Sequence, residues 1–306
     1  MVDITAKCNR GFGTINKIQT ILETKLFGRY YFQVGKTMID SMLIGAILTN
    51  IEVAYNLTKN EIEKLQKCHE NGLRKLLSLP SKTPKQMLYL LTGSSPIECT
   101  IKRRRLVYLH HILTRSEESF IRTFFEHQLK TRKTKDWATQ ILKDLAQFEI
   151  NSSMEEIRAI SETDWKQLIK NETVQITLRF LNSNQGSKSR QYNELKMAPY
   201  LSPNDEYIDF KTASFIAKTQ TYMVENIKCN YKEKFKPNLT CKSCLISECN
   251  QKHLLYCSKL FGSNELVTYI PEYSDIFDDD NINEQNYIAT LLMENLKKKK
   301  LIENIV

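Results

Sequence analysis

Four residues with the chemistry of metal ligands lie in one short stretch near the end of the chain, at Cys241, Cys244, His253 and Cys257. Two cysteines separated by two residues can hold a metal ion from one side. A histidine and a cysteine separated by three residues fit one turn of a helix and can complete a tetrahedron. Three thiolates and one imidazole are a closed ligand set for structural Zn²⁺, with no position left for a catalytic water. The spacing therefore predicts a zinc module.

The alternative interpretation is that these four side chains are unrelated and are simply buried or oxidised. The tight spacing and the presence of both halves favour zinc. Cys249 lies between the halves and could replace Cys244 or His253, but we favour a role outside the ligand set. If the site forms, metal binding supplies the folding energy of the module, on the order of 10 kcal/mol apparent at neutral pH.

Aromatic rings and cations alternate just before this stretch. Tyr231 and Phe235 are interleaved with Lys232, Lys234 and Lys236. Proteins that bind single strands use this combination, because rings stack on bases while cations contact phosphates. The alternative is an amphipathic connector whose rings pack on the zinc module. The adjacent metal site favours the nucleic-acid interpretation.

A second cationic cluster runs from Lys102 through Arg103 and Arg104 to Arg105. Four consecutive cations project around much of a helix, so at least two must face solvent whatever the packing. The three arginines are candidate phosphate contacts, and binding through them would weaken steeply with salt. A solvated helix face stabilised by nearby acids is the alternative, and charge alone does not decide between the two.

The composition predicts a mainly α protein. Glycine (9) and proline (7) are scarce among 306 residues, which argues against many tight β-turns. A formal net charge of +9 favours a polyanionic partner, although many soluble proteins reach this value without one. The longest apolar run, 42–48, is too short to span a bilayer, so no membrane partner is expected.

The first five residues include the polar Asp3 and Thr5 and do not begin the apolar core of a signal peptide. We therefore expect the protein inside the cell, in the cytoplasm or the nucleus, where thiols stay reduced.

Periodicity and capping signals place the helices that must position these residues. Gly11-Phe-Gly13 is interpreted as a flexible entry, and the aromatic segment after Gly28 as extended backbone. The predicted helices cover residues 14–26, 36–54, 58–79 with a capping box at Thr58 and Glu61, about 96–115, about 136–148, from Ser153, and about 163–181.

Residues 27–35 (FGRYYFQVG), 41–113 and 135–145 (KDWATQILKDL), in this order, resemble the region after the catalytic palm in non-LTR retrotransposon reverse transcriptases. In that family this region is the thumb and a helical linker. The family also ends in a module with the spacing C-x2-C-x8-H-x3-C, and the four predicted zinc ligands fall on it. The resemblance extends from about residue 5 to about residue 300.

The resemblance implies a multi-helix thumb and linker region, a second helical region and a small CCHC zinc module. Their expected boundaries are 1–150 for the thumb-like and linker region, 151–230 for the second helical region, 231–262 for the zinc module, and 263–306 for an acidic turn and a C-terminal helix.

We expect no catalytic activity, since the palm aspartates that hold two Mg²⁺ in reverse transcriptases are missing. Phe277 followed by Asp278–Asp280 mimics their hairpin, but it follows the zinc module and lacks flanking apolar strands. The chain resembles a C-terminal fragment that binds template RNA, target DNA or their hybrid beside a missing palm domain. The alternative is a protein-interaction module or a structural relic with no nucleic-acid role.

Overall fold

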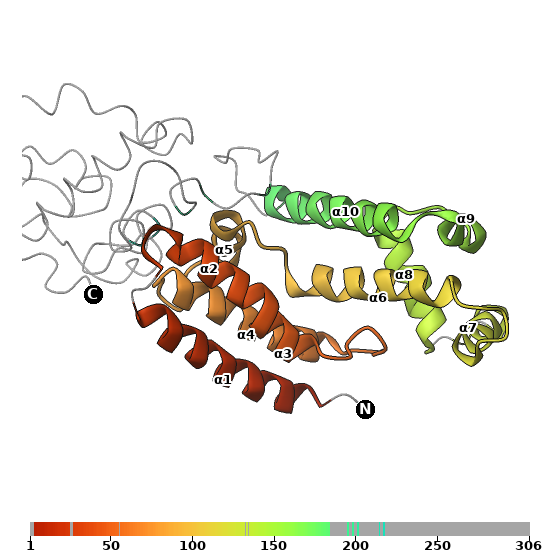
Figure 1. Cartoon of the computed structure of the whole chain (residues 1–306), viewed down its shortest axis with the longest axis horizontal. Helices are drawn as coiled ribbons and strands as arrows, with labels where there is room; N and C mark the ends of the chain where they lie inside the picture. Colours follow the sequence, from red (N-terminus) through yellow and green to blue (C-terminus); the bar gives the residue numbers. More distant parts are fainter. Residues whose placement is uncertain are drawn as a thin grey trace, which may run out of the picture. The chain divides into compact units, whose positions relative to one another are not determined.

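The computed structural model describes residues 3–24, 27–54, 56–131, 133 and 135–183, together with residues 195, 198, 201, 214 and 217. In these ranges every regular element is a helix and no strand occurs (Figure 1). The prediction of a mainly α protein is confirmed for this part of the chain. None of these helices combines the length and the apolar character needed to cross a bilayer.

The helices are α1 (Ile4–Glu23), η1 (Gly28–Tyr30), α2 (Tyr31–Met38), η2 (Ile39–Leu43), α3 (Ile44–Leu48), α4 (Lys59–Leu76), α5 (Lys85–Thr92), α6 (Ile97–Leu113), α7 (Phe120–Thr131), α8 (Trp137–Gln147), α9 (Met154–Ala159) and α10 (Glu162–Ser183). Backbone contacts group the chain into two compact units. Unit 1 contains residues 1–18, 38–72 and 92–196, and unit 2 contains residues 19–37, 73–91 and 197–306.

In unit 1, a glycine sets how closely α1 packs. A Cβ at Gly11 would lie 2.6 Å from Ile47 Cγ2 and 2.7 Å from Cys68 Sγ, so no larger residue fits without a shift. The prediction that residues 11–13 form a flexible entry is therefore wrong. Gly11 lies inside α1, where the missing side chain lets this helix approach α3 and α4.

Local hydrogen bonds set several helix starts at the positions that the sequence predicts. The Glu61 amide donates to Thr58 Oγ1 (3.3 Å), and the Thr58 amide donates to Glu61 Oε2 (2.8 Å), which forms the predicted capping box of α4. Ser153 and Glu156 form a second capping box at α9. At α8, Asp136 Oδ1 accepts from the Thr139 amide (2.7 Å).

The long helices α6 and α10 pack along one another in unit 1 (Figure 1). Trp165 of α10 is completely buried, and its Nε1 donates to the carbonyl oxygen of Leu106 in α6 (2.8 Å). Apolar residues of α7, α8 and α9 join the same core. The predicted domain boundary between residues 150 and 151 consequently falls inside unit 1, because the helices after it share this core with α6.

In unit 2, the aromatic segment after Gly28 is helical, so the expectation of extended backbone is wrong. Phe32 and Gly35 are both buried, and their spacing of three positions matches one face of a helix rather than the alternation of a strand. A Cβ at Gly35 would clash with Leu76 and crowd Leu22. This close packing requires glycine at that position.

Candidate functional site

The packing of α6 against its neighbours buries one arginine of the cationic cluster and leaves two others on a groove. Arg105 is only 4% exposed, and its Nη1 donates to Oδ2 of Asp144 in α8 (2.8 Å). Asp144 is fully buried and also accepts from Gln140 Nε2 (2.9 Å). Arg105 therefore forms a buried ion pair between two helices and is not accessible to a phosphate, so we leave it out of the candidate surface.

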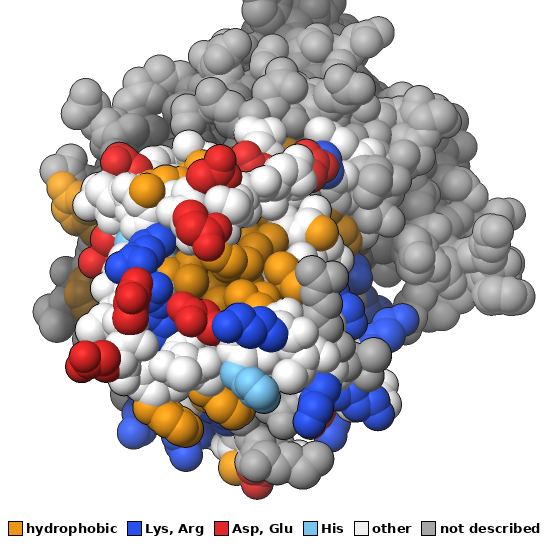
Figure 2. Space-filling view, turned by 90° about the vertical axis from the view of Figure 1, so that its right-hand side faces the viewer, with side chains coloured by type: hydrophobic (Ala, Val, Ile, Leu, Met, Phe, Trp, Pro, Cys, Tyr) orange, Lys and Arg blue, Asp and Glu red, His pale blue; other side chains and the backbone are white. Residues whose placement is uncertain are grey.

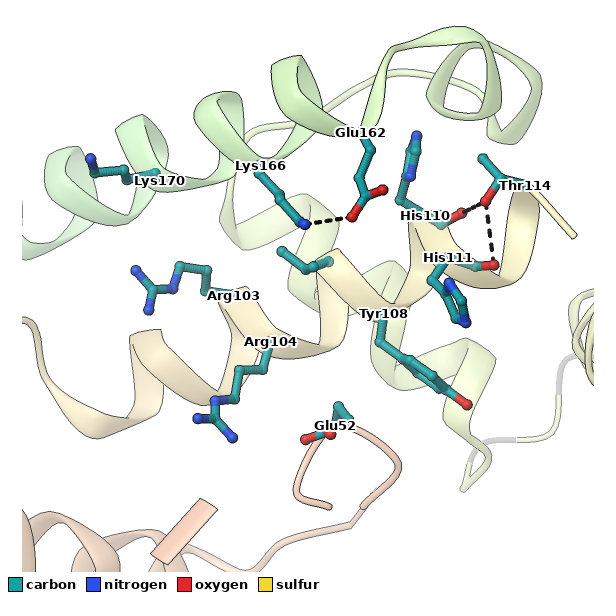
Figure 3. A pocket seen from close by; sticks show the side chains of 11 residues that line it. Glu52, Arg103, Arg104, Tyr108, His110, His111, Thr114, Glu162, Lys166 and Lys170 are labelled. Atoms are coloured by element: carbon teal, nitrogen blue, oxygen red, sulfur yellow. Dashed lines mark hydrogen bonds and ion pairs between the residues drawn. The ribbon is translucent and has the colours of Figure 1, made fainter. Parts of the chain in front are cut away.

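Arg103 and Arg104 lie on a different side of α6 and line a groove of about 610 Å³. Lys166 and Lys170 of α10 line the same groove (Figure 3). Both lysines are exposed. Because they are four positions apart, they lie about 6 Å from one another along the helix axis. Four cations from two helices thus converge on one concave surface.

The sequence did not single out the two lysines. Lysines at this spacing are common on solvated helices and carry no signal until α10 is known to pack on α6. The repeat of charges at positions 162, 166 and 170 is the one feature that could have indicated a shared face.

The groove carries more positive than negative charge. Its two arginines and two lysines face only Glu52 and Glu162, which leaves a formal charge of about +2 when the histidines are neutral. Arg104 Nη1 donates to the carbonyl oxygen of Leu48 (3.0 Å), and Lys166 pairs with Glu162. A hydrogen bond from the Lys166 ammonium, followed by its charge, lowers the pKa of Glu162.

Three cations of the groove have no ion pair with any residue that the structure describes, namely Arg103, Arg104 and Lys170. Burial lowers the pKa of Arg103, the charge of Arg104 lowers it further, and Asp40 opposes both effects. A guanidinium stays protonated under these influences, so Arg103 presents a positive charge that no ion pair with a described residue neutralises. Such a group favours an anion.

The same groove continues past two rings of α6. The ring centroids of Tyr108 and His111 lie 6.1 Å apart with the planes tilted by 31°. Tyr108 also meets Trp137 edge to face at 5.8 Å. Nη2 of Arg115 lies 2.8 Å from Nε2 of His111.

An acceptor without a donor lies in this groove. Oε2 of Glu52 is buried and has no hydrogen-bond partner among the residues that the structure describes. Buried polar atoms are almost always paired, so an exception at a concave surface indicates a place for a donor from outside the chain.

The other predicted site residues lie in the part of the chain that the structure does not describe. They are the zinc ligands Cys241, Cys244, His253 and Cys257, and the ring and lysine segment formed by Tyr231, Lys232, Lys234, Phe235 and Lys236. Within the described ranges, no three histidine, cysteine or acidic side chains come together as a metal site would need.

The described cysteines are buried and free. Burial raises the pKa of the Cys8 thiol. It also raises the pKa of Cys68 to about 12 and the pKa of Cys99 to about 11. A thiol with a pKa of about 11 is roughly one part in a thousand thiolate at pH 8, and the thiolate is the reactive form.

We expect these three thiols to stay unmodified when the native protein is treated with iodoacetamide at pH 8, and to react fully in urea. Mass spectrometry of tryptic peptides measures both, and native labelling at the rate of an exposed thiol would contradict the packing.

No family model, curated protein or solved structure matches the chain. The geometry of the groove and the charges around it are therefore the observations from which a function is argued.

Proposed function

We propose that this chain binds the phosphate backbone of RNA or DNA through the groove between α6 and α10. The observation that carries the proposal is the convergence of Arg103, Arg104, Lys166 and Lys170 on one concave surface that holds only two acids. The resemblance to the thumb and linker of non-LTR reverse transcriptases agrees with this role. Template RNA, target DNA and their hybrid are the partners that it suggests.

The two walls of the groove suit a phosphodiester chain. Arginine forks can contact two phosphate oxygens at once, and lysines supply compact charges that adapt to the backbone. An anion between α6 and α10 would be contacted from both sides. Contacts of this kind position a strand without reading its bases, so we expect binding with little sequence preference.

For the C-terminal region the proposal rests on the sequence alone. Structural Zn²⁺ held by Cys241, Cys244, His253 and Cys257 would fold a second contact module, and the preceding rings and lysines would hold a single strand. The chain would act as a non-catalytic limb beside a palm domain supplied by another segment or chain. Such a role belongs in the cytoplasm or the nucleus.

Removing the four cations of the groove tests the proposal. We expect a variant carrying Arg103→Ala, Arg104→Ala, Lys166→Ala and Lys170→Ala to bind a fluorescein-labelled RNA–DNA hybrid much more weakly than the unmodified chain. The slope of log K against log salt should become shallower by about 3, because each neutralised phosphate contributes roughly 0.7–0.9. Fluorescence anisotropy between 50 and 200 mM salt measures both quantities.

The matched control removes the same number of charges outside the groove. Lys17, Lys59, Lys130 and Lys133 are exposed and do not line it, so their replacement by alanine should change the slope far less. Equal losses in the two variants would show that binding follows net charge and not this groove. Circular dichroism checks that both variants fold.

A protein-interaction role is the second candidate function, and one surface feature favours it. Phe120 and Phe124 on α7 are 79% and 51% exposed, and their rings stack at a centroid distance of 6.0 Å. Figure 2 shows a face on which an apolar area is bordered by charged side chains. Exposed apolar areas of this kind often mark protein interfaces. Absence of salt-sensitive nucleic-acid binding by the unmodified chain would favour this alternative.

A further inference from the structure

We infer that the groove between α6 and α10 holds an unpaired nucleotide, with its phosphate among the four cations and its base against the rings of Tyr108 and His111. This inference rests on the proposed function and goes beyond it, because backbone binding needs no contact with a base. The inference gives the aromatic residues of the groove the role of contacting a base, which phosphate contacts do not explain.

The groove has two chemically different halves (Figure 3). Arg103 of α6 lies on the side of Lys166 and Lys170 of α10, whereas the side chain of Arg104 points toward the loop that carries Glu52, and these four cations form the cationic half. Further along, Tyr108 and His111 of α6 and Thr114, just after its end, form a half without cationic side chains of lysine or arginine. A nucleotide has the same division, because its phosphate is anionic and its base is flat and largely uncharged.

The ring of Tyr108 is held in place for such a contact. It is partly buried against the core of unit 1 and meets Trp137 edge to face at 5.8 Å. Trp137 is fixed in turn, since its Nε1 donates to the carbonyl oxygen of Glu52 (2.8 Å). A ring that is oriented before binding loses little conformational entropy when a base stacks on it.

The unpartnered carboxylate oxygen of Glu52 favours a nucleotide over a bare phosphate. A phosphodiester group carries no donor for this oxygen, and inorganic phosphate offers only its P–OH protons. A nucleoside carries donors, in its ribose hydroxyls and in the exocyclic amines of most bases, and these would satisfy it. The volume of about 610 Å³ lies within the range of roughly 300–1,000 Å³ that is usual for small-ligand sites.

The test compares strands with and without bases. A labelled single strand and a strand of the same length made of abasic residues carry the same phosphates. We expect the unmodified chain to prefer the intact strand by roughly tenfold, in line with base stacking on aromatic side chains. The preference should fall to nearly one in Tyr108→Ala and persist in Tyr108→Phe, with the salt slope unchanged in both.

His111→Ala provides a variant at an exposed position, where folding is not at risk. It should reduce the preference for the intact strand without changing binding of the abasic strand. Equal affinity of the unmodified chain for both strands would overturn the inference. The proposed function would survive that result if the variant without the four cations still bound more weakly.

Competition with small ligands separates the sources of the nucleotide. Adenosine 5′-monophosphate should displace the labelled strand at lower concentration than inorganic phosphate does, which supports nucleotide recognition. If it displaces the strand as well as a short oligonucleotide does, the occupant is a free nucleotide. Displacement by inorganic phosphate and by the monophosphate at equal concentrations would contradict a base site.

Discussion

Replacing Asp144 with alanine will lower the free energy of unfolding by about 3–5 kcal/mol, because it leaves the buried charge of Arg105 without a partner. The 2.8 Å contact between Arg105 Nη1 and Asp144 Oδ2 joins α6 to α8 in a place where both side chains are at most 4% exposed. Urea denaturation followed by circular dichroism measures the change in midpoint.

A double variant separates the ion pair from simple packing. Arg105→Met combined with Asp144→Leu removes both charges and keeps apolar volume, so we expect it to recover most of the lost stability. Within the described ranges Arg105 Nε is buried without a hydrogen-bond partner, so the pair leaves one polar atom unsatisfied. A double variant as unstable as Asp144→Ala would show that the site depends on shape and not on charge.

If the zinc module that the sequence predicts between Cys241 and Cys257 forms, removal of the metal is expected to unfold it. The expected loss is on the order of 10 kcal/mol of apparent binding energy at neutral pH, because the free ligand set does not hold the fold by itself. Elemental analysis of purified protein should find one zinc per chain. Limited proteolysis should cut near these residues after chelation and not before it.

Single substitutions identify the ligands. Cys241→Ser and Cys257→Ser should each lose zinc, whereas Cys249→Ser should keep it, since Cys249 lies outside the favoured ligand set. Lowering the pH should also release the metal, because protonation of the thiolates competes with it. Purified protein without stoichiometric zinc, or equal metal loss in Cys249→Ser, would reject this ligand set.

The helix starts were predictable because their causes are local. Thr58 and Glu61 accept from each other's backbone amides within one turn. Asp136 accepts from the Thr139 amide at the start of α8. Gly11 was misread for the opposite reason. Its role depends on Ile47 and Cys68, which are distant in sequence, so a residue that normally loosens a helix instead permits close packing of α1.

The sequence by itself determined that the described part of this chain is mainly helical, that the chain is basic, and that four cations follow one another on one helix. Only the tertiary structure decided which of those cations can meet a ligand. Consecutive residues on a helix point about 100° apart, so packing turns Arg105 inward to Asp144 and leaves Arg103 and Arg104 on the groove. The same packing adds Lys166 and Lys170 from α10, which no pattern along the chain connects to α6.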